Sequence, residues 1–323
     1  LFVASAHEYL MIFTRSGQCH WLKVWQIPPA GRHSRGKPIV NLLNIDPADD
    51  IASVVPIREF SDDRYLLFCT KGGKIKKTAL SAYGNVRSVG LIGINIVEGD
   101  ELIDVQVTSG EDEVILATKN GLAIRFRESD TRVMGRVAAG VRGIRLGKGD
   151  QVVGMVVVAR DEATLLVVSE SGMGKRSEID AYRLQGRGGK GVINLKATER
   201  TGKVVAIKSV VPGDQLMIIT RNGVINRQRI DEIRVIGRAT QGVRLVNLDK
   251  NDKVMDVARV IPEDAENGEP DDSAEGSSES GGAVEGEGAV VDGEGAEVVE
   301  VAEASSDAGA GDDVGTDPAT EGE

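Results

Sequence analysis

The chain has 323 residues, of which 41% are apolar and only 3% aromatic, so it can bury a substantial core. Two cysteines, Cys19 and Cys69, are too few for a disulfide framework or a cysteine zinc site, and we expect both to be buried apolar residues. Because no apolar run is long enough to cross a bilayer and the first residues lack a secretory signal, we expect a cytoplasmic protein that does not contact the membrane.

The net charge of -11 combines two regions of opposite sign. Residues 263–323 contain 21 Asp and Glu and no Lys or Arg, which leaves 50 - 21 = 29 acidic against 39 basic residues in 1–262, a net charge of +10. The acidic segment lacks aromatic residues and cannot bury enough surface to offset the entropy lost on ordering. We therefore expect a folded basic domain over residues 1–262 and a disordered acidic tail over residues 263–323.

A two-residue turn that ends in glycine recurs along the first region, and an apolar, strand-like run precedes each copy. The turns are Ser16-Gly17, Gly72-Gly73, Asn120-Gly121, Ser171-Gly172 and Asn222-Gly223, and the runs before them are residues 9–14, 65–70, 114–118, 165–169 and 216–220. Each pattern predicts a β-hairpin. The two Asn-Gly turns indicate type I′ geometry, which needs positive φ at both central residues.

A second glycine follows each hairpin at a nearly constant distance. These closing glycines stand at positions 36, 90, 140, 191 and 242, which are 19, 17, 19, 19 and 19 residues after the turn glycines. Four of the loops share the pattern Gly-Arg-x-x-x-Gly, at residues 31–36, 135–140, 186–191 and 237–242. Apolar residues alternate after the loops and predict one more strand, at Val40/Leu42, Ile94/Ile96, Ile144/Leu146 and Val246/Leu248.

A further apolar run opens each following unit, at residues 51–57, 102–107, 152–158, 204–210 and 254–261. Each unit thus has about four short strands over roughly 50 residues, the size of a propeller blade. A solenoid is the structural alternative. A ring of blades explains better why the chain ends on an isolated strand at 254–261, which we expect to complete the sheet of the first blade. Helical pattern is limited to single turns near residues 177–182 and 231–236.

Basic residues recur in register with the repeat, four residues after the turn glycines and inside the loops. Any one of them is best explained as a solvated surface residue. As a set they favour a basic belt, because equivalent positions in a ring of blades lie on one perimeter. The candidate residues are Lys77, Arg125, Arg176 and Arg227 of the hairpins, and Arg32, Arg35, Lys37, Arg87, Arg136, Arg142, Arg187, Lys190, Arg238 and Arg244 of the loops.

Enzyme motifs are missing from the sequence. The three histidines have no metal-ligand spacing, and there is no nucleophile elbow or Walker-type loop. We expect no catalytic centre and no bound cofactor in this chain.

Several stretches closely resemble the C-terminal domain of the bacterial DNA gyrase A subunit, and the resemblance covers residues 1–262. It is carried by Gly36-Lys37-Pro38-Ile39-Val40-Asn41-Leu42-Leu43, Thr108-Ser109-Gly110-Glu111-Asp112-Glu113-Val114, Gly140-Val141-Arg142-Gly143-Ile144-Arg145-Leu146 and Ile236-Gly237-Arg238. The family implies an all-β β-pinwheel, a propeller-like ring of six four-stranded blades that exchange strands with their neighbours. Five repeats are visible here.

The segment Gln185-Gly186-Arg187-Gly188-Gly189-Lys190-Gly191 resembles the box of that family, Gln-Arg-Arg-Gly-Gly-Lys-Gly. Free glycine amides and two fixed cations suit a phosphate ligand. Gly186 replaces the first arginine of the box, and the segment lies in the fourth of five units, whereas the family has its box in the first blade. We therefore expect a first blade with the principal box to precede Leu1, which is not a methionine.

The resemblance implies that the basic rim binds and wraps duplex DNA without sequence preference. The domain would support ATP-dependent negative supercoiling by a gyrase holoenzyme of two A and two B subunits, a type IIA topoisomerase whose other parts use ATP and Mg²⁺. Topoisomerase IV has an equivalent domain and is the nearer alternative. A propeller that serves as a protein-interaction platform, or a hydrolase with a central site, is the more distant one. The acidic tail either competes with DNA for the rim or only solvates the chain.

Overall fold

The structure, a computed structural model, describes residues 4–29, 36–85, 89–160 and 162–260. The acidic tail 263–323 and the site candidates Arg32, Arg35 and Arg87 lie outside the described residues. Within the described part no helix is long and apolar enough to span a membrane. Both cysteines are buried and free, as the sequence predicts.

The described residues form five antiparallel sheets, each of which is one blade. From the inner to the outer strand, the first blade consists of β3 (Ile51–Ile57), β1 (Tyr9–Thr14), β2 (Gln18–Lys23) and β6 (Leu91–Ile92). The second blade consists of β7 (Leu102–Thr108), β4 (Tyr65–Thr70), β5 (Lys74–Ala79) and β10 (Val141–Arg142). The third blade consists of β11 (Val152–Val158), β8 (Glu113–Thr118), β9 (Leu122–Arg127) and β14 (Val192–Ile193). The fourth blade consists of β15 (Val204–Val210), β12 (Thr164–Ser169), β13 (Met173–Glu178) and β18 (Val243–Arg244). In the fifth, three strands are described, β19 (Val254–Val260), β16 (Gln215–Thr220) and β17 (Ile225–Arg229).

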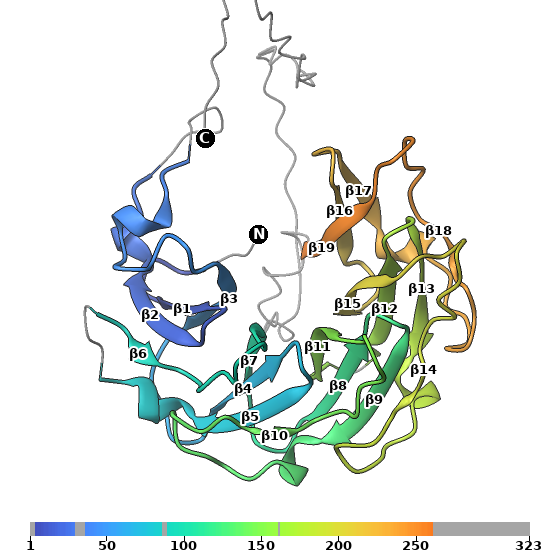
Figure 1. Cartoon of the computed structure of the whole chain (residues 1–323). Helices are drawn as coiled ribbons and strands as arrows, with labels where there is room; N and C mark the ends of the chain where they lie inside the picture. Colours follow the sequence, from blue (N-terminus) through green and yellow to red (C-terminus); the bar gives the residue numbers. More distant parts are fainter. Residues whose placement is uncertain (1–3, 30–35, 86–88, 161, 261–323) are drawn as a thin grey trace, which may run out of the picture. The chain divides into compact units, whose positions relative to one another are not determined.

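Short 3₁₀ helices follow the hairpins, and the two predicted helical turns are among them. They are η1 (Val24–Gln26), η3 (Leu80–Tyr83), η4 (Glu128–Asp130), η5 (Ile179–Ala181) and η6 (Ile230–Glu232), while η2 (Ile39–Asn41) lies later in its repeat. The all-β, bladed architecture predicted from the repeat is confirmed. Figure 1 shows β3, β7, β11, β15 and β19 on the inner side of the blades and β6, β10, β14 and β18 on the outer side.

The five predicted hairpins are present, but the type I′ prediction is wrong. Gly121 has a φ of +87° whereas Asn120 is not among the residues with positive φ, and the Gly121 amide donates to the carbonyl of Thr118 at 3.0 Å. The connection is therefore a three-residue loop in which only the glycine adopts the left-handed conformation. The hydroxyl of Thr118 accepts the amide of Leu122 at 3.2 Å and stabilises this longer turn.

The outer strand of each four-stranded blade comes from the next repeat along the chain. β10 belongs to the repeat that begins with β8, yet it pairs with β5 of the preceding repeat. These strands are two residues long and directly follow the closing glycine, not the later apolar pairs where we predicted them. The apolar residues Ile94 and Ile144 are instead buried between blades. The glycine before each one donates its amide to a hairpin turn, Gly93 to the carbonyl of Gly17 and Gly143 to that of Gly73, both at 2.8 Å.

The prediction that the final strand completes the sheet of the first blade is wrong. β19 pairs with β16 of its own repeat over Gln215↔Val260 to Thr220↔Val254. The other runs expected to open the next unit, such as 51–57, likewise pair with the first strand of their own hairpin. Each four-stranded sheet thus combines three strands of one repeat with one strand of the next.

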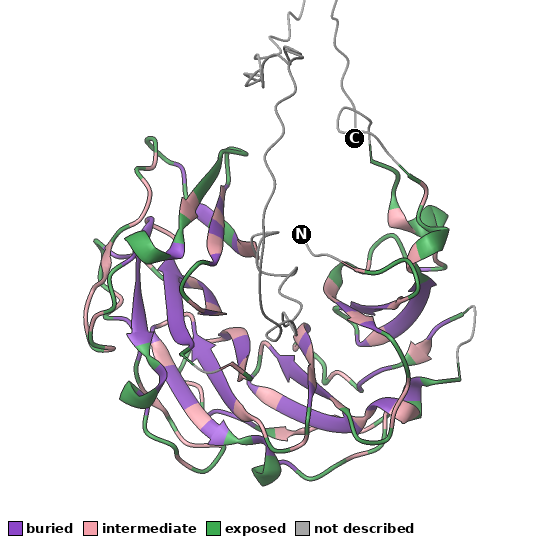
Figure 2. Cartoon of the chain, turned by 180° about the vertical axis from the view of Figure 1, so that it is seen from behind, coloured by how far each residue is buried: buried purple, intermediate pink, exposed green. Residues whose placement is uncertain are grey.

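The hydrophobic core lies between consecutive sheets. Phe13 of β1 and Phe68 of β4, in neighbouring blades, meet edge to face with ring centroids 5.3 Å apart. Figure 2 shows the middle strands of the blades as buried and the surrounding loops as largely exposed. Burial on both faces makes the first hairpin strands β1, β4, β8 and β12 nearly continuous apolar runs, which is why the sequence signal for them is strong.

Candidate nucleic-acid interface

Three outer loops carry most of the described basic candidates. They are residues 131–142, 182–193 and 233–244, which run from the end of a 3₁₀ helix through the exchanged strand in the third, fourth and fifth repeats. We call them the third, fourth and fifth outer loops. Because each one crosses the outer edge of the preceding blade, the surface of one blade is formed by the loop of the next repeat.

Hydrogen bonds join successive outer loops to one another. The amide of Arg145, just after the third loop, donates to the carbonyl of Gly189 in the fourth at 2.8 Å, and the amide of Lys196 donates to Thr240 in the fifth at 2.9 Å. The amide of Gly188 also donates to the carbonyl of Gly143 at 2.6 Å. The outer surface is therefore one connected band.

The closing glycines are required by the backbone of each loop. Gly191 has a φ of +76°, and a Cβ placed on it would lie 2.3 Å from the carbonyl oxygen of Ala123. Gly242 has a φ of +79°, with the carbonyl oxygen of Gly174 only 2.6 Å from such a Cβ. Any side chain at these positions would push the loop off the strand behind it.

Two loop arginines connect consecutive repeats in the same way. Arg187 donates from Nε to the carbonyl of Asp130 at 2.9 Å and from Nη1 to the carbonyl of Arg142 at 3.1 Å. Arg238 donates to Ala181 at 3.0 Å and to Ile193 at 3.0 Å. Each guanidinium thus joins the end of a 3₁₀ helix to the preceding exchanged strand, which fixes its place on the outer surface.

The predicted site residues of the loops and of the hairpins differ in exposure. Those of the loops are at the surface or half-buried: Lys37, Arg142, Gly186, Arg187, Lys190 and Arg244 are exposed, and Arg136, Gln185, Gly188, Gly189, Gly191 and Arg238 are half-buried. Of the hairpin candidates only Arg227, in β17 of the fifth blade, is exposed.

The other three hairpin candidates do not lie on an exposed belt, and that expectation is wrong. Lys77 and Arg176 are 5% and 8% exposed. Arg125 forms an ion pair with Glu113 at 2.6 Å and donates to the carbonyls of Ile179 and Tyr182. The outer loop of the next repeat covers these positions, forming isolated bridges at Lys77↔Val133, Arg125↔Leu184 and Arg176↔Val235. Arg125 and Arg176 hold the fourth and fifth outer loops from behind by donating to the carbonyls of Tyr182 and Ile233. The ammonium of Lys77 instead donates to the carbonyl of Gly110 and lies 3.7 Å from Glu128.

The sequence interpretation missed a second set of loop arginines. Arg132, Arg183 and Arg234 are all exposed and occupy equivalent positions, since 183 - 132 = 51 and 234 - 183 = 51. Each lies three residues before the glycine that opens the Gly-Arg-x-x-x-Gly pattern. Their spacing of one repeat was the signal that could have identified them.

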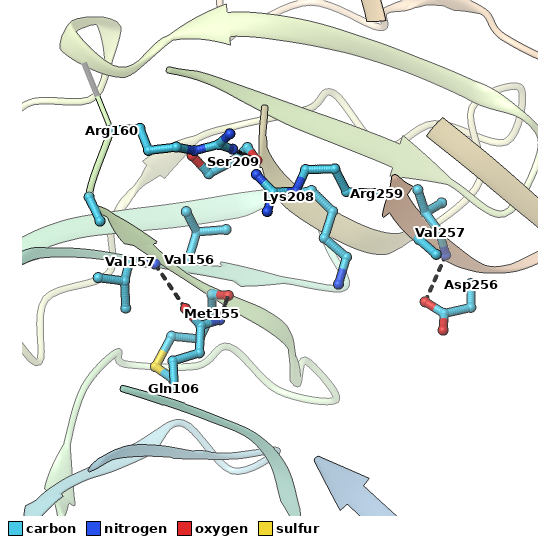
Figure 3. Close-up of a pocket in the computed structure, with 12 residues that line it drawn as sticks. Gln106, Met155, Val156, Val157, Arg160, Lys208, Ser209, Asp256, Val257 and Arg259 are labelled. Carbon is cyan, nitrogen blue, oxygen red and sulfur yellow. Dashed lines mark hydrogen bonds between the residues drawn. The ribbon is translucent and has the colours of Figure 1, made fainter. Parts of the chain in front are cut away.

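A pocket of about 430 Å³ lies on the inner side, away from the outer loops (Figure 3). Lys208, Arg160 and Arg259 line it, and both arginines pair with the buried carboxylate of Asp214, at 3.4 and 3.6 Å. Among the residues that the structure describes, no group of three or more His, Cys, Asp and Glu is arranged to hold a metal ion. Two of the lining cations are thus paired with a structural carboxylate that lies outside the pocket lining.

A family model described as the DNA gyrase C-terminal domain, β-propeller, matches five consecutive segments of the chain. The segments are residues 8–58, 64–109, 112–159, 163–210 and 214–261. Each contains one hairpin, the following loop and the inner strand, so the family repeat coincides with the structural one.

Curated relatives of this chain include the DNA gyrase A subunits of Salmonella typhimurium, 43% identical over 260 residues, and of Deinococcus deserti, 44% identical over 269 residues. These matches cover 80% and 82% of this chain but only 30% and 33% of the relatives. Among solved structures, the C-terminal domain of DNA topoisomerase IV is similar with a TM-score of 0.73 at 28% identity, covering 79% of this chain and 80% of that one. A DNA gyrase A C-terminal domain is similar with a TM-score of 0.70 at 25% identity, covering 80% and 84%.

Proposed function

The chain belongs to the DNA gyrase C-terminal domain family, and from that premise we propose that its outer loops bind the phosphates of duplex DNA without sequence preference. The observation that carries the proposal is the repetition of exposed cations on one connected band. Arg132, Arg183 and Arg234 recur at one position, and Arg142 and Arg244 at another. Sequence-neutral binding needs many such contacts, because each neutralised phosphate releases counterions.

We further propose that the DNA bends around this band. Bending a site of 20–30 base pairs by a large angle costs about 1–6 kcal/mol, so a protein that bends DNA must distribute its contacts along the curve. Loops that are one repeat apart and hydrogen-bonded to one another provide such a distribution. Arg187 and Arg238 donate hydrogen bonds to backbone carbonyls, so their side chains are already ordered before DNA binds. This limits the side-chain entropy lost on binding.

Within a whole enzyme, this domain would wrap DNA and present a distant segment for strand passage. The chain spans about a third of the length of the gyrase A subunits that it matches, so this role rests on those relatives. We assign strand cleavage to the remainder of the gyrase A polypeptide, and ATP hydrolysis to the gyrase B polypeptide, in an A2B2 type IIA topoisomerase of the cytoplasm. ATP and Mg²⁺ would serve those parts, and this chain would contribute no catalytic residue.

Two other functions are alternatives to DNA wrapping by a gyrase A subunit. The equivalent domain of topoisomerase IV is the nearer one, and the 42–44% identity to gyrase A subunits over 80% or more of the chain favours gyrase. A protein-interaction platform is the more distant one, and it predicts no affinity for non-specific duplex in a gel shift.

The test is the affinity of the whole chain for two duplexes of unrelated sequence, measured between about 50 and 200 mM salt. Six or more phosphate contacts predict equal affinities and a log-log slope of about -5 or steeper. The variant carrying R142A, R187A and R244A together should flatten the slope by about 3, because each lost contact removes about 0.9. Arg58→Ala, which removes an exposed cation outside the outer loops, is the matched control and should leave the slope unchanged. A flat salt dependence of the unmodified chain would exclude phosphate-driven wrapping.

A further inference from the structure

Two lysines are completely buried at equivalent positions of two blades. Lys76 of β5 and Lys175 of β13 each stand three residues after a turn glycine, Gly73 or Gly172, and each is 0% exposed. A buried ammonium is costly unless its protons are bonded to acceptors. The partners of these two lysines therefore show what their charges are used for.

Lys175 binds the backbone of the fifth outer loop. Its Nζ donates to the carbonyls of Gly237 at 3.0 Å and Arg238 at 2.8 Å, and to the hydroxyl of Ser177 at 2.7 Å. The Ser177 hydroxyl in turn donates to the carbonyl of Ile236 at 2.8 Å. Three consecutive loop residues are thus bonded to one strand of the preceding repeat.

Lys76 binds the third outer loop in the same manner. Its Nζ donates to the carbonyl of Arg136 at 2.7 Å and to that of Gly93, and it lies 3.4 Å from the hydroxyl of Tyr83. The ammonium also stands over the ring of Phe68, 4.4 Å from its centroid. In both blades the carbonyl bound belongs to the arginine of the Gly-Arg-x-x-x-Gly pattern.

We propose that Lys76 and Lys175 are positioning residues for DNA binding: each holds the outer loop of the next repeat from behind and thereby fixes Arg136 or Arg238 on the outer surface. The inference deepens the proposed function and rests on it for the role of the arginines. The anchoring of the loops is a separate statement that can be tested without DNA.

The fourth outer loop provides an internal control. The equivalent position beneath it is Ile124, three residues after Gly121, and this side chain belongs to the hydrophobic core. A Cβ on Gly189 would lie 3.5 Å from Cδ1 of Ile124, so the loop rests on an apolar side chain. Two of the three loops have a buried lysine behind them and one has an isoleucine, although their backbones are alike.

Burial lowers the pKa of both lysines to about 7, and the nearby guanidinium of Arg136 or Arg238 adds to this effect. The titratable groups around Lys76 are Cys19, Tyr83 and Arg136, and those around Lys175 are Arg238 and, through Ser177, Tyr182. Because the loop carbonyls cover Nζ, opening the loop exposes the amine and returns its pKa toward the ordinary value of 10.5. The open loop then binds more protons between pH 7 and 10.5, so the closed loop gains stability as the pH rises through this range.

Amide hydrogen exchange of the unmodified chain, measured between about pH 7 and pH 9 and corrected for the intrinsic rate, tests the anchoring directly. We expect protection of residues 132–142 and 234–244 to rise by up to tenfold per pH unit, while protection of residues 183–193 stays level. Lys175→Met should abolish the rise in 234–244 and leave that in 132–142. Equal pH dependence in all three loops, or a rise that persists in Lys175→Met, would overturn the inference. The comparison of the three loops needs no variant, so a Lys175→Met chain that does not fold leaves the test intact.

DNA affinity at constant pH then tests the positioning of the arginine. Lys175→Met as the single substitution should weaken DNA affinity about three- to tenfold. In a chain that already carries Arg238→Ala, it should cause no additional loss of affinity. Ile124→Met, a substitution of similar volume at the same register, should have no effect on DNA affinity. Fully additive losses would show that Lys175 does not act through Arg238. If neither the unmodified chain nor any variant bound DNA, the proposed function would fail. The hydrogen-exchange test of loop anchoring would still be valid.

Discussion

The fourth and fifth outer loops share one backbone design but rest on different side chains. In both, an arginine bonds the end of a 3₁₀ helix and the preceding exchanged strand, and a glycine in the left-handed conformation closes the loop. Behind the fourth loop stands Ile124, and behind the fifth stands the ammonium of Lys175. The loop whose own sequence is richest in glycine is thus the one without a buried lysine behind it, because the supporting residue comes from the preceding repeat.

The largest effect is expected where the two loops are alike, at the closing glycines. Gly191→Ala and Gly242→Ala should each destabilise the chain by about 2–4 kcal/mol, since a Cβ would meet a backbone carbonyl and the positive φ is itself costly. Urea unfolding measures this. Gly186→Ala and Gly237→Ala are matched controls with open space at the Cβ, and they should change stability by less than about 0.5 kcal/mol. A large loss for only one closing glycine would show that the loops are not built alike.

The next effect separates the two loops by pH. The folded pKa of Lys175, about 7, lies below its ordinary value of 10.5, so the unfolded chain binds more protons between these limits and stability rises with pH. The unmodified chain should therefore gain about 1–2 kcal/mol more than Lys175→Met between about pH 7 and pH 9 in denaturant unfolding. Ile124→Met should follow the unmodified chain. Parallel curves for all three proteins would contradict a buried lysine with a lowered pKa beneath the fifth loop.

A smaller effect concerns the contribution of each loop to DNA binding. Arg187→Ala with Lys190→Ala, and Arg238→Ala with Arg244→Ala, should each make the salt dependence of affinity shallower by about 2. Equal changes would make the two loops equivalent contacts among many. A topology assay on relaxed circular DNA distinguishes a special role: loss of wrapping with affinity retained, in the first variant only, would identify residues 185–191 as the organising site.

The smallest effect is expected from the acidic tail, whose charge should act on the cations of both loops alike. Deleting residues 263–323 should raise DNA affinity about threefold at low salt and less at high salt, because the interaction is screened. Unchanged affinity at low salt would mean that the tail only solvates the chain.

The hairpins, the visible repeats and the closing glycines could all be predicted from the sequence. These features are local: a strand, a turn glycine and a loop glycine lie within about 25 residues of one another and recur with the repeat. The repeat also predicted a ring of blades, whereas the exchange of strands came only from the resemblance to a known family, because the spacing alone did not reveal it.

Which residues face outward could not be predicted from the sequence. Lys77, Arg125 and Arg176 have the register of a basic belt, yet loops from the following repeat cover them. The exposure of a side chain depends on which distant segment crosses its strand, and a repeat pattern does not state whether the fourth strand of a blade comes from its own repeat or from the next. For the same reason the buried charge of Lys175 became interpretable only once residues 236–238 were seen to lie against it.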